Sequence, residues 1–250
     1  MATLETRDRP ARYSEEEWQA RVDLAAAYRL AAHFGYAYLI YNHITMRVPG
    51  TEHFLINQFG LRYDEMTASS LVKLDLNGNV IDGPEKVNVP GFVIHSAIHG
   101  ARHDVQCVMH THTPYGMTVS SLQCGLVPLT QDGMSFYNRV AYHDYEGLSV
   151  DVDERERLVT DLGNHDALIL RNHGLLTVGR SVGEAFVNMY NLERACQVQV
   201  QAMSTGQPLN MPPHEVCERA ARQLTSRSFA GDEWEAYLRL LDSLDPSYRD

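Results

Sequence analysis

Residues 104–113, DVQCVMHTHT, and residues 166–179, DALILRNHGLLTVG, are the stretches that decide the fold of this chain. Each begins with a short apolar run and then reaches histidine, a pattern typical of a buried β-strand that ends at the edge of a sheet. Alternate side chains of a strand share one face, so His110 and His112 are expected to project together. In the second stretch a glycine turn follows His173, and LLTVG continues beyond it.

The histidines of these two stretches have the pattern of a metal site. Two imidazoles on one face of a strand can chelate a single ion, and neutral imidazole is the commonest nitrogen ligand for zinc, iron and manganese. A third ligand must then come from elsewhere, and His173 is the natural candidate because a turn lets its side chain project over the sheet edge. The alternative is that HTH is only a polar strand end and His173 a capping residue.

The rest of the chain mixes strands and helices. Alternating β-rich stretches around Pro49–Gly50 and Asn77–Gly78 predict two hairpins, and apolar residues at helical spacing predict four helices. The hairpins are expected at 38–57 and 71–81, and the helices at 14–34, 91–101, 182–204 and 233–241. This order indicates an α/β or α+β fold with a mostly antiparallel sheet.

Size and composition predict one domain and a small-molecule partner. A chain of 250 residues with 44% hydrophobic content can bury one substantial core. A formal net charge of −11 argues against nucleic acid, which is bound by basic patches. No CxxC pair occurs, so the cysteines are expected to be buried thiols: Cys107, Cys124, Cys196 and Cys217.

The expected location is the cytoplasm, without a membrane anchor. No apolar run is long enough to span a bilayer. The first residues, MATLETRDRPARYSEEEW, are too polar for the hydrophobic region of a signal peptide.

Five stretches together resemble the class II aldolase and adducin family. They are YNHITMRVPG, FLINQFGLRYDEMTASSLVKLDLNGN, PGFVIHSAIHGARHDVQCVMHTHT, LILRNHGLLTVG and VGEAFVNMYNLERACQ. The resemblance covers about residues 17–205 and leaves 206–250 as a helical extension of a single domain. It implies a three-layer α/β/α sandwich around a largely antiparallel sheet, and a homotetramer with active sites between subunits.

The resemblance also implies a role for each histidine. In the sugar-phosphate aldolases of the family a His-x-His pair and one later histidine bind zinc, and these roles fall on His110, His112 and His173. Zinc is therefore the expected metal, with iron or manganese as alternatives. Bound in this way, the metal polarises a ketone during cleavage of a carbon–carbon bond.

The chain departs from those aldolases at the substrate. Their acid/base glutamate is replaced by Gly91, and two serines that bind substrate phosphate are replaced by Val89 and Pro90. A non-phosphorylated substrate is therefore expected. The remaining substrate-binding positions are Asn42, Asn57 and Gly60, with Thr45 in the same loop as Asn42.

His95 is the predicted replacement for the missing glutamate. It follows Gly91 by one helical turn, and so shares its side of the helix. An imidazole there could be a fourth ligand or a general base, since its ordinary pKa suits proton transfer at neutral pH. The alternative is that His95 and His99 face a packing interface. Asp64 and Glu65 are weaker candidates, because an acidic turn is usually just solvated.

Other polar residues are expected to be structural. His143, Asp144 and Glu146, in YHDYEG, are interpreted as a solvated loop. Glu184 and Glu193 are expected to cap helices and form ion pairs.

Three functions remain open on the sequence alone. The leading hypothesis is a metal-dependent lyase, of aldolase or decarboxylase type, that acts on a small carbonyl or carboxylate substrate. The second is a non-haem iron oxygenase, since the resemblance extends to a branch of the superfamily that reacts with dioxygen, and three histidines without a carboxylate leave open positions on iron. The third is a non-catalytic adducin-like interaction domain, against which the three convergent histidines argue.

Overall fold

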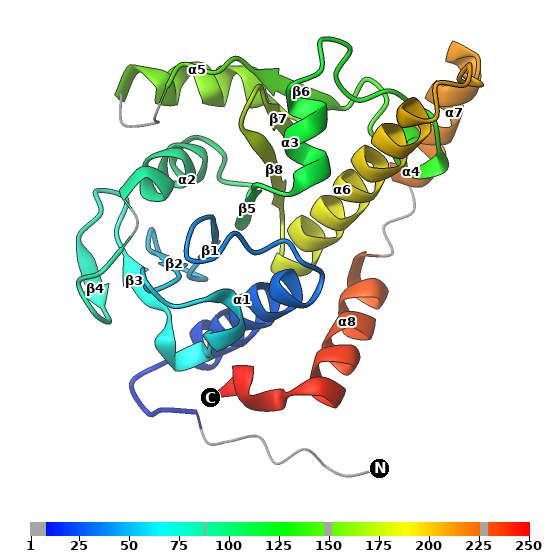
Figure 1. Cartoon of the computed structure of the whole chain (residues 1–250). Coiled ribbons are helices and arrows are strands. Elements are labelled where there is room, and N and C mark those ends of the chain that lie inside the picture. The colour runs from blue at the N-terminus through cyan, green and yellow to red at the C-terminus, as the bar shows by residue number, and fades with distance from the viewer. Residues whose placement is uncertain (1–8, 88, 148–151, 226–229) are drawn as a thin grey trace.

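An eight-stranded mixed sheet forms the centre of the molecule, in the order β4-β3-β2-β1-β5-β8-β7-β6 (Figure 1). The computed structural model describes residues 9–87, 89–147, 152–225 and 230–250. The strands are β1 (His43–Arg47), β2 (Phe54–Ile56), β3 (Val72–Leu74), β4 (Val80–Asp82), β5 (Cys107–Thr111), β6 (Val140–His143), β7 (Ala167–Leu170) and β8 (Gly174–Gly179). Every neighbouring pair is antiparallel except β6 and β7, which run parallel.

Helices cover both faces of this sheet. They are α1 (Glu15–His33), α2 (Val89–Ala101), α3 (Pro114–Ser120), α4 (Gln131–Ser135), α5 (Val152–Leu162), α6 (Val182–Ser204), α7 (His214–Thr225) and α8 (Ala230–Leu244). Short 3-10 turns are η1 (Tyr63–Glu65), η2 (Ala68–Ser70) and η3 (Pro246–Arg249). None of the described helices is both long and apolar enough to cross a membrane.

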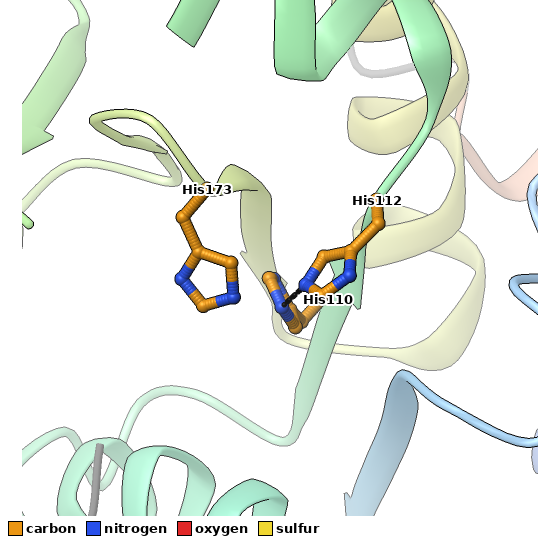
Figure 2. A group of neighbouring side chains, drawn as sticks. All are labelled: His110, His112 and His173. Carbon is orange, nitrogen blue, oxygen red and sulfur yellow. Dashed lines mark hydrogen bonds between the residues drawn. The ribbon is translucent and has the colours of Figure 1, made fainter. Parts of the chain in front are cut away.

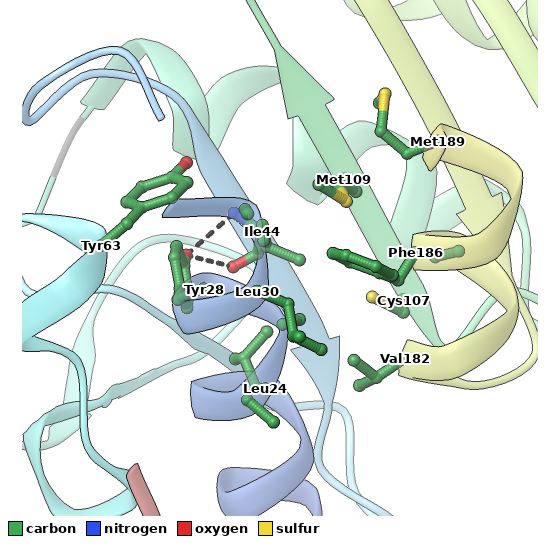
Figure 3. Close-up of a cluster of buried hydrophobic side chains, with 14 of the residues drawn as sticks. Leu24, Tyr28, Leu30, Ile44, Tyr63, Cys107, Met109, Val182, Phe186 and Met189 are labelled. Atoms are coloured by element: carbon green, nitrogen blue, oxygen red, sulfur yellow. Dashed lines mark hydrogen bonds between the residues drawn. The ribbon is translucent and has the colours of Figure 1, made fainter. Parts of the chain in front are cut away.

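The main core lies between the sheet and the layer of α1 and α6. Figure 3 shows Tyr28 of α1, Met109 of β5, and Phe186 and Met189 of α6 meeting in this layer. The ring of Tyr28 lies edge-on to that of Tyr63, and its hydroxyl donates to the carbonyl oxygen of Ile44 at 2.5 Å. This bond ties α1 to β1, the strand next to the histidine strand β5.

A second core lies on the opposite face of the sheet. Val108 of β5 packs there with Ile94 and Ile98 of α2 and Leu158 of α5. Neighbouring residues of β5 therefore face different helix layers, as the alternation of a strand requires. The two cores confirm the expected three-layer α/β/α sandwich.

The predicted hairpins are both present. β1 and β2 pair antiparallel across the Pro49–Gly50 turn, and Gly50 has the positive φ of 72° that suits glycine. β3 and β4 pair across the turn that contains Gly78, with a register shift at Lys73 and Leu74. In both hairpins the turn lies at the periphery, and β1, β2 and β3 are mostly buried, whereas the edge strand β4 is partly exposed.

The sequence patterns did not predict strand β6 or the helices α3, α4, α5 and α7. His143 ends β6 and is buried, with its Nδ1 2.8 Å from the Asp161 carboxylate of α5 and its Nε2 3.7 Å from Glu154. The interpretation of His143 as part of a solvated loop is therefore wrong. Asp144 and Glu146, which follow it, are exposed as expected.

The ends of the long helices have the expected caps. Ser14 accepts a hydrogen bond from the backbone N–H of Glu17 at the start of α1. Ser181 does the same for Glu184 in α6, and Glu184 also forms an ion pair with Arg180. The Glu184 carboxylate accepts from the backbone N–H of Arg180 at 2.6 Å, so it contributes to the cap and forms the ion pair expected of it.

Three of the four cysteines are buried, as expected, and the fourth is not. Cys107 lies in β5, Cys196 in α6 and Cys217 in α7, all inside the protein. Cys124 is exposed, in the loop after α3. The expectation that all four are buried is therefore wrong for Cys124, because that loop runs over the surface.

Candidate metal centre

Strand β5 presents His110 as a buried side chain with a defined proton position. Its Nδ1 lies 2.8 Å from the carbonyl oxygen of Leu175 in β8. A carbonyl can only accept a hydrogen bond, so Nδ1 carries the proton and Nε2 keeps its lone pair. This is the arrangement in which a histidine ligand is oriented by a backbone acceptor.

His112 and His173 bring their rings to the same point (Figure 2). The Nε2 atoms of His110 and His112 lie 2.9 Å apart, and the ring centroid of His173 lies 4.8 Å from that of His110 and 4.7 Å from that of His112. One ligand atom from each of the three residues lies within 4.8 Å of the others. Two nitrogens bound to one zinc ion are about 3.3 Å apart in a tetrahedral site, so His110 and His112 already lie near this spacing and the widest separation must close by up to about 1.5 Å.

The turn between β7 and β8 places the third histidine. Asn172 has a φ of +56°, which reverses the chain directly before His173. Gly174 then passes so close to β5 that an added Cβ would collide with the carbonyl oxygen of Thr111 and lie 3.2 Å from the His112 ring. The positive φ of Asn172 and the close approach of Gly174 to β5 explain why asparagine and glycine flank His173.

Burial keeps the three imidazoles neutral. Loss of solvent lowers the pKa of His110 well below its ordinary value, with the neighbouring His173 and His112 adding to the effect. Burial, and then the nearby His112 and His143, lower the pKa of His173 to about 4. Neutral rings have lone pairs available for a metal at neutral pH.

His43 also belongs to this region, although its sequence pattern did not indicate it. His43 pairs with His110 across β1 and β5, and their ring centroids lie 5.6 Å apart. Burial lowers the pKa of His43 to about 3, and within the described residues neither of its ring nitrogens has a hydrogen-bond partner. In the sequence, His43 is marked only by its alternation with Thr45 along the strand. Its place beside His110 follows from the register of β1 on β5, which the sequence does not contain.

His95 lies beyond His43, one ring further from the three clustered histidines. Its ring centroid is 4.7 Å from that of His43, and its Nδ1 lies 2.8 Å from the Thr45 hydroxyl. The same hydroxyl lies 2.8 Å from Nε2 of His99, so the two imidazoles of α2 share it. His95 is fully buried and belongs to no group of potential metal ligands in the described part of the chain.

The predicted substrate positions lie along β1 and the loop after β2. Asn42 is buried with a φ of +71°, and its side-chain amide has no hydrogen-bond partner among the described residues. The side chain of Asn57 accepts from Tyr28, and its own amide nitrogen is unpaired in the same sense. Gly60 is exposed with a φ of +100°. Of these residues Asn42 adjoins the metal region, through its neighbour His43.

Two tyrosines flank the outer side of the histidine cluster. The ring centroid of Tyr38 lies 5.7 Å from that of His112, and the centroid of Tyr145 lies 6.2 Å from that of His173. Both tyrosine side chains are about half exposed, at 52% and 54%. The cluster is thus open toward solvent between aromatic side chains.

The structure does not bring the other acidic candidates to the cluster. Asp64 and Glu65 are exposed and form ion pairs with Arg62. The side chains of residues 89–91, where the aldolase serines and glutamate are replaced, lie outside the described part of the structure.

The mixed sheet between two helix layers, with three histidines that converge at the ends of its central strands and could hold a metal ion, defines the class of α/β/α protein to which this chain is compared. A family model for the Class II Aldolase and Adducin N-terminal domain matches residues 22–200. The chain is 48% identical over 249 residues to a protein of Pseudomonas aeruginosa named for the class 2 aldolases, covering 97% of this chain and 96% of that one. The chain belongs to the class II aldolase and adducin family.

Its relatives include both enzymes and adducins. A crystal structure of an aldolase II superfamily protein from Pseudomonas syringae has a TM-score of 0.92 at 50% identity, covering 96% of this chain and 98% of that one. L-fuculose 1-phosphate aldolase from Glaciozyma antarctica has a TM-score of 0.82 at 33% identity, covering 98% of each chain. Alpha-adducin of Rattus norvegicus is 45% identical over 93% of this chain and 34% of the adducin.

Proposed function

We propose that this chain is a metal-dependent carbon–carbon lyase, of aldolase or decarboxylase type, acting on a small, non-phosphorylated carbonyl or carboxylate substrate. The observation that carries the proposal is the convergence of His110, His112 and His173 on one point, without a carboxylate in the group among the described residues. Three protein ligands leave coordination positions open for substrate, as catalytic metal sites do.

The donor set fits a divalent metal, with zinc as the first expectation and iron or manganese as alternatives. When bound, such an ion polarises a carbonyl oxygen and stabilises the charge that develops on it as a carbon–carbon bond breaks. The three histidines would hold it, and the Leu175 carbonyl orients His110 from behind.

Other residues would position the substrate and move its proton. Tyr38 and Tyr145 would lie against a substrate that enters from solvent. We propose that Asn42, Asn57 and Gly60 contribute to its binding, and the unpaired amide of the buried Asn42 supports this because such a group gains by meeting a polar ligand. We propose His95 as the acid/base group, with the His43 ring lying between it and His110.

The first prediction concerns metal content and turnover together. We expect about one metal ion per chain in purified protein, and strong loss of metal in His110→Ala and His173→Ala. The exposed His103 supplies a matched control, because His103→Ala removes a histidine outside the cluster. Elemental analysis measures the occupancy. Full occupancy in both cluster variants would show that the ligands are assigned wrongly.

The same proteins, loaded with Zn²⁺, Mn²⁺ or Fe²⁺, are then assayed on hydroxy-ketoacids, aromatic carboxylates and L-fuculose 1-phosphate. We expect metal-dependent turnover of a non-phosphorylated compound. The sugar phosphate is expected to react poorly, because Val89 and Pro90 carry no hydroxyl for a phosphate. Efficient cleavage of the sugar phosphate would contradict the substrate proposal.

Assays on the same metal-loaded proteins distinguish two other functions. The all-histidine donor set also suits a non-haem iron oxygenase, which would consume dioxygen after anaerobic loading with iron. The similarity to alpha-adducin favours a non-catalytic interaction domain, for which metal-loaded protein would turn over nothing. Assembly into a homotetramer and a cytoplasmic location stay predictions.

A further inference from the structure

Helix α6 holds the end of the histidine strand from the side opposite the metal cluster. Because side chains alternate, His110 and His112 face the cluster while Thr111 and Thr113 face away from it. The Thr111 hydroxyl donates to Sδ of Met189 at 3.2 Å, and the Thr113 hydroxyl donates to Oε2 of Glu193 at 2.5 Å. The two acceptors lie one turn apart on the same face of α6.

Glu193 is a buried carboxyl group whose hydrogen-bond partners among the described residues belong to this loop. Its side chain is buried, and Oε2 also accepts from the backbone N–H of Gly116 at 2.9 Å. Thr113, at the N-cap of α3, makes no side-chain capping bond itself, so Glu193 supplies the cap from another helix. The ion pair expected of Glu193 is therefore wrong within the described residues, although the expected capping role is present.

The same loop is locked to β8. A Cβ at Gly116 would lie 2.6 Å from Cγ of Leu175 and 2.7 Å from the Thr113 hydroxyl, so α3 is packed directly on both. The backbone carbonyl of Leu175 orients the His110 ring. Glu193, the start of α3 and β8 thus form one packed unit around two of the three metal histidines.

His112 is the histidine of the pair that needs such support. Strand β5 ends at Thr111, which is its last residue paired with β8. His112 therefore lies beyond the ladder, and its ring is only half-buried. The next residue that is fixed by a side chain is Thr113, and Glu193 is what fixes it.

We propose that Glu193 is a positioning residue of the metal centre, which holds Thr113 and the first turn of α3 so that the His112 ring faces His110 and His173. The inference rests on the proposed metal site but on no particular reaction. The metal centre would bind a divalent cation, so the role of Glu193 is measured as a change in cation affinity.

The test compares affinity for Co²⁺, with Zn²⁺ by chelator competition, among Glu193→Ala, Glu193→Gln and Thr113→Val. Loss of an outer contact to a ligand typically weakens metal binding about 10–100-fold, and we expect this for Glu193→Ala and Thr113→Val. Glu193→Gln keeps an acceptor oxygen in the same place and is expected to bind within about threefold of the unchanged protein. Combining Thr113→Val with Glu193→Ala is expected to add little, because both remove one contact.

Glu184→Ala is the matched control, since Glu184 lies on the same helix but bonds to Arg180 and not to the histidine loop. It is expected to leave cation affinity unchanged. Thermal unfolding of the metal-free variants separates a loss of stability from a loss of ligand placement. The visible spectrum of bound Co²⁺ adds a readout of ligand geometry, and it is expected to change in Thr113→Val.

Unchanged Co²⁺ and Zn²⁺ affinity in folded Glu193→Ala and Thr113→Val would overturn the inference. If Glu193→Ala does not fold, Thr113→Val, which keeps its shape, decides alone. Failure of the unchanged protein to bind either cation would overturn this inference and the proposed function together. Cation binding with the expected variant effects, but without turnover of any substrate, contradicts the lyase and still supports the role of Glu193.

Discussion

At the scale of single residues, Glu193 and His95 are polar groups held inside the protein for different reasons. Burial raises the pKa of Glu193 to about 7, while its bonds from Thr113 and Gly116 lower it and offset part of that effect. His95 is bonded through Thr45, and burial lowers its pKa well below the ordinary value. Changing either residue is therefore expected to alter the free energy of unfolding in its own way.

The second prediction is a pH-dependent difference between the unchanged protein and Glu193→Gln. The folded pKa of Glu193 lies above the ordinary value of 4.5, so between about pH 4.5 and 7 the unfolded chain releases a proton that the folded chain keeps. The free energy of unfolding therefore falls as pH rises through this range, by up to about 3 kcal/mol, and levels off above it. Glutamine cannot ionise, so the free energy of unfolding of Glu193→Gln does not fall for this reason.

Urea unfolding of both proteins from about pH 5 to about pH 8 measures the difference. The free energy of unfolding of Glu193→Gln, relative to that of the unchanged protein, is expected to rise up to about pH 7. Above that pH the difference between the two is expected to stay constant. A difference that is constant across this range would show that Glu193 ionises normally in the folded protein.

The third prediction concerns His95. If it is the acid/base group, His95→Ala keeps the metal, because no ligand contact is removed, and lowers turnover about 10²–10⁴-fold. The variant also loses about 2–4 kcal/mol of stability, since a buried side chain bonded to Thr45 is deleted.

His99→Ala is the control for this loss. His99 shares the Thr45 hydroxyl and is also buried, but it lies one turn further along α2. It should lose similar stability and keep its turnover. If both variants lose only stability, His95 is a packing residue and has no part in the proposed reaction.

At the scale of elements, the β7–β8 hairpin is the part of the fold on which the site depends most directly. It carries His173 at its turn, and its strand β8 pairs with β5 over five positions, from Cys107 to Thr111. A shift of this hairpin would therefore move the third histidine against the other two. Gly174 lies where the turn contacts β5, and its lack of a side chain allows the turn to come this close to the strand.

The fourth prediction is that Gly174→Ala weakens both fold and metal site. The new methyl group would collide with the Thr111 carbonyl and press on the His112 ring, and overpacking of this kind costs about 2 kcal/mol or more. Melting temperature and Zn²⁺ affinity should both fall. In Gly100→Ala a Cβ meets nothing within 4 Å, and that variant is expected to gain up to about 1 kcal/mol of helix stability. Equal behaviour of the two variants would contradict the role of Gly174.

At the scale of the whole molecule, the C-terminal segment belongs to the main core. Leu241 of α8 and Tyr248 of η3 are buried in the same cluster as residues of α1 and α6. The Trp234 ring packs on Phe186, and Gly183 faces it where a side chain would not fit. That the whole chain folds as one domain stays a prediction, which loss of this packing can test.

The fifth prediction tests that unity with Tyr248→Ala. Deleting a fully buried aromatic ring that also donates to Asp242 is expected to cost about 3–5 kcal/mol. Because Trp18 lies on α1 and Trp234 on α8, fluorescence and circular dichroism should report one shared transition at lower denaturant. Leu244→Ala, at an exposed position of α8, should change little. A separate early transition seen only by fluorescence would indicate an independent C-terminal unit.

The sequence by itself determined most elements and the three histidines of the cluster. Alternation in DVQCVMHTHT, the Pro49–Gly50 and Asn77–Gly78 turns, and the helical spacing in 14–34 and 182–204 are local patterns, and the backbone follows them locally. The family resemblance supplied the layers and the pairing of His173 with the His-x-His motif.

Only the tertiary structure decided which distant groups meet. The parallel strand β6 carries a buried histidine within a polar stretch, so its hydrophobic pattern was too weak to be recognised. His43 faces His110 through the register of β1 on β5, and Glu193 reaches Thr113 from a position 80 residues away. No local periodicity contains such contacts, because they depend on how strands and helices pack after each has formed.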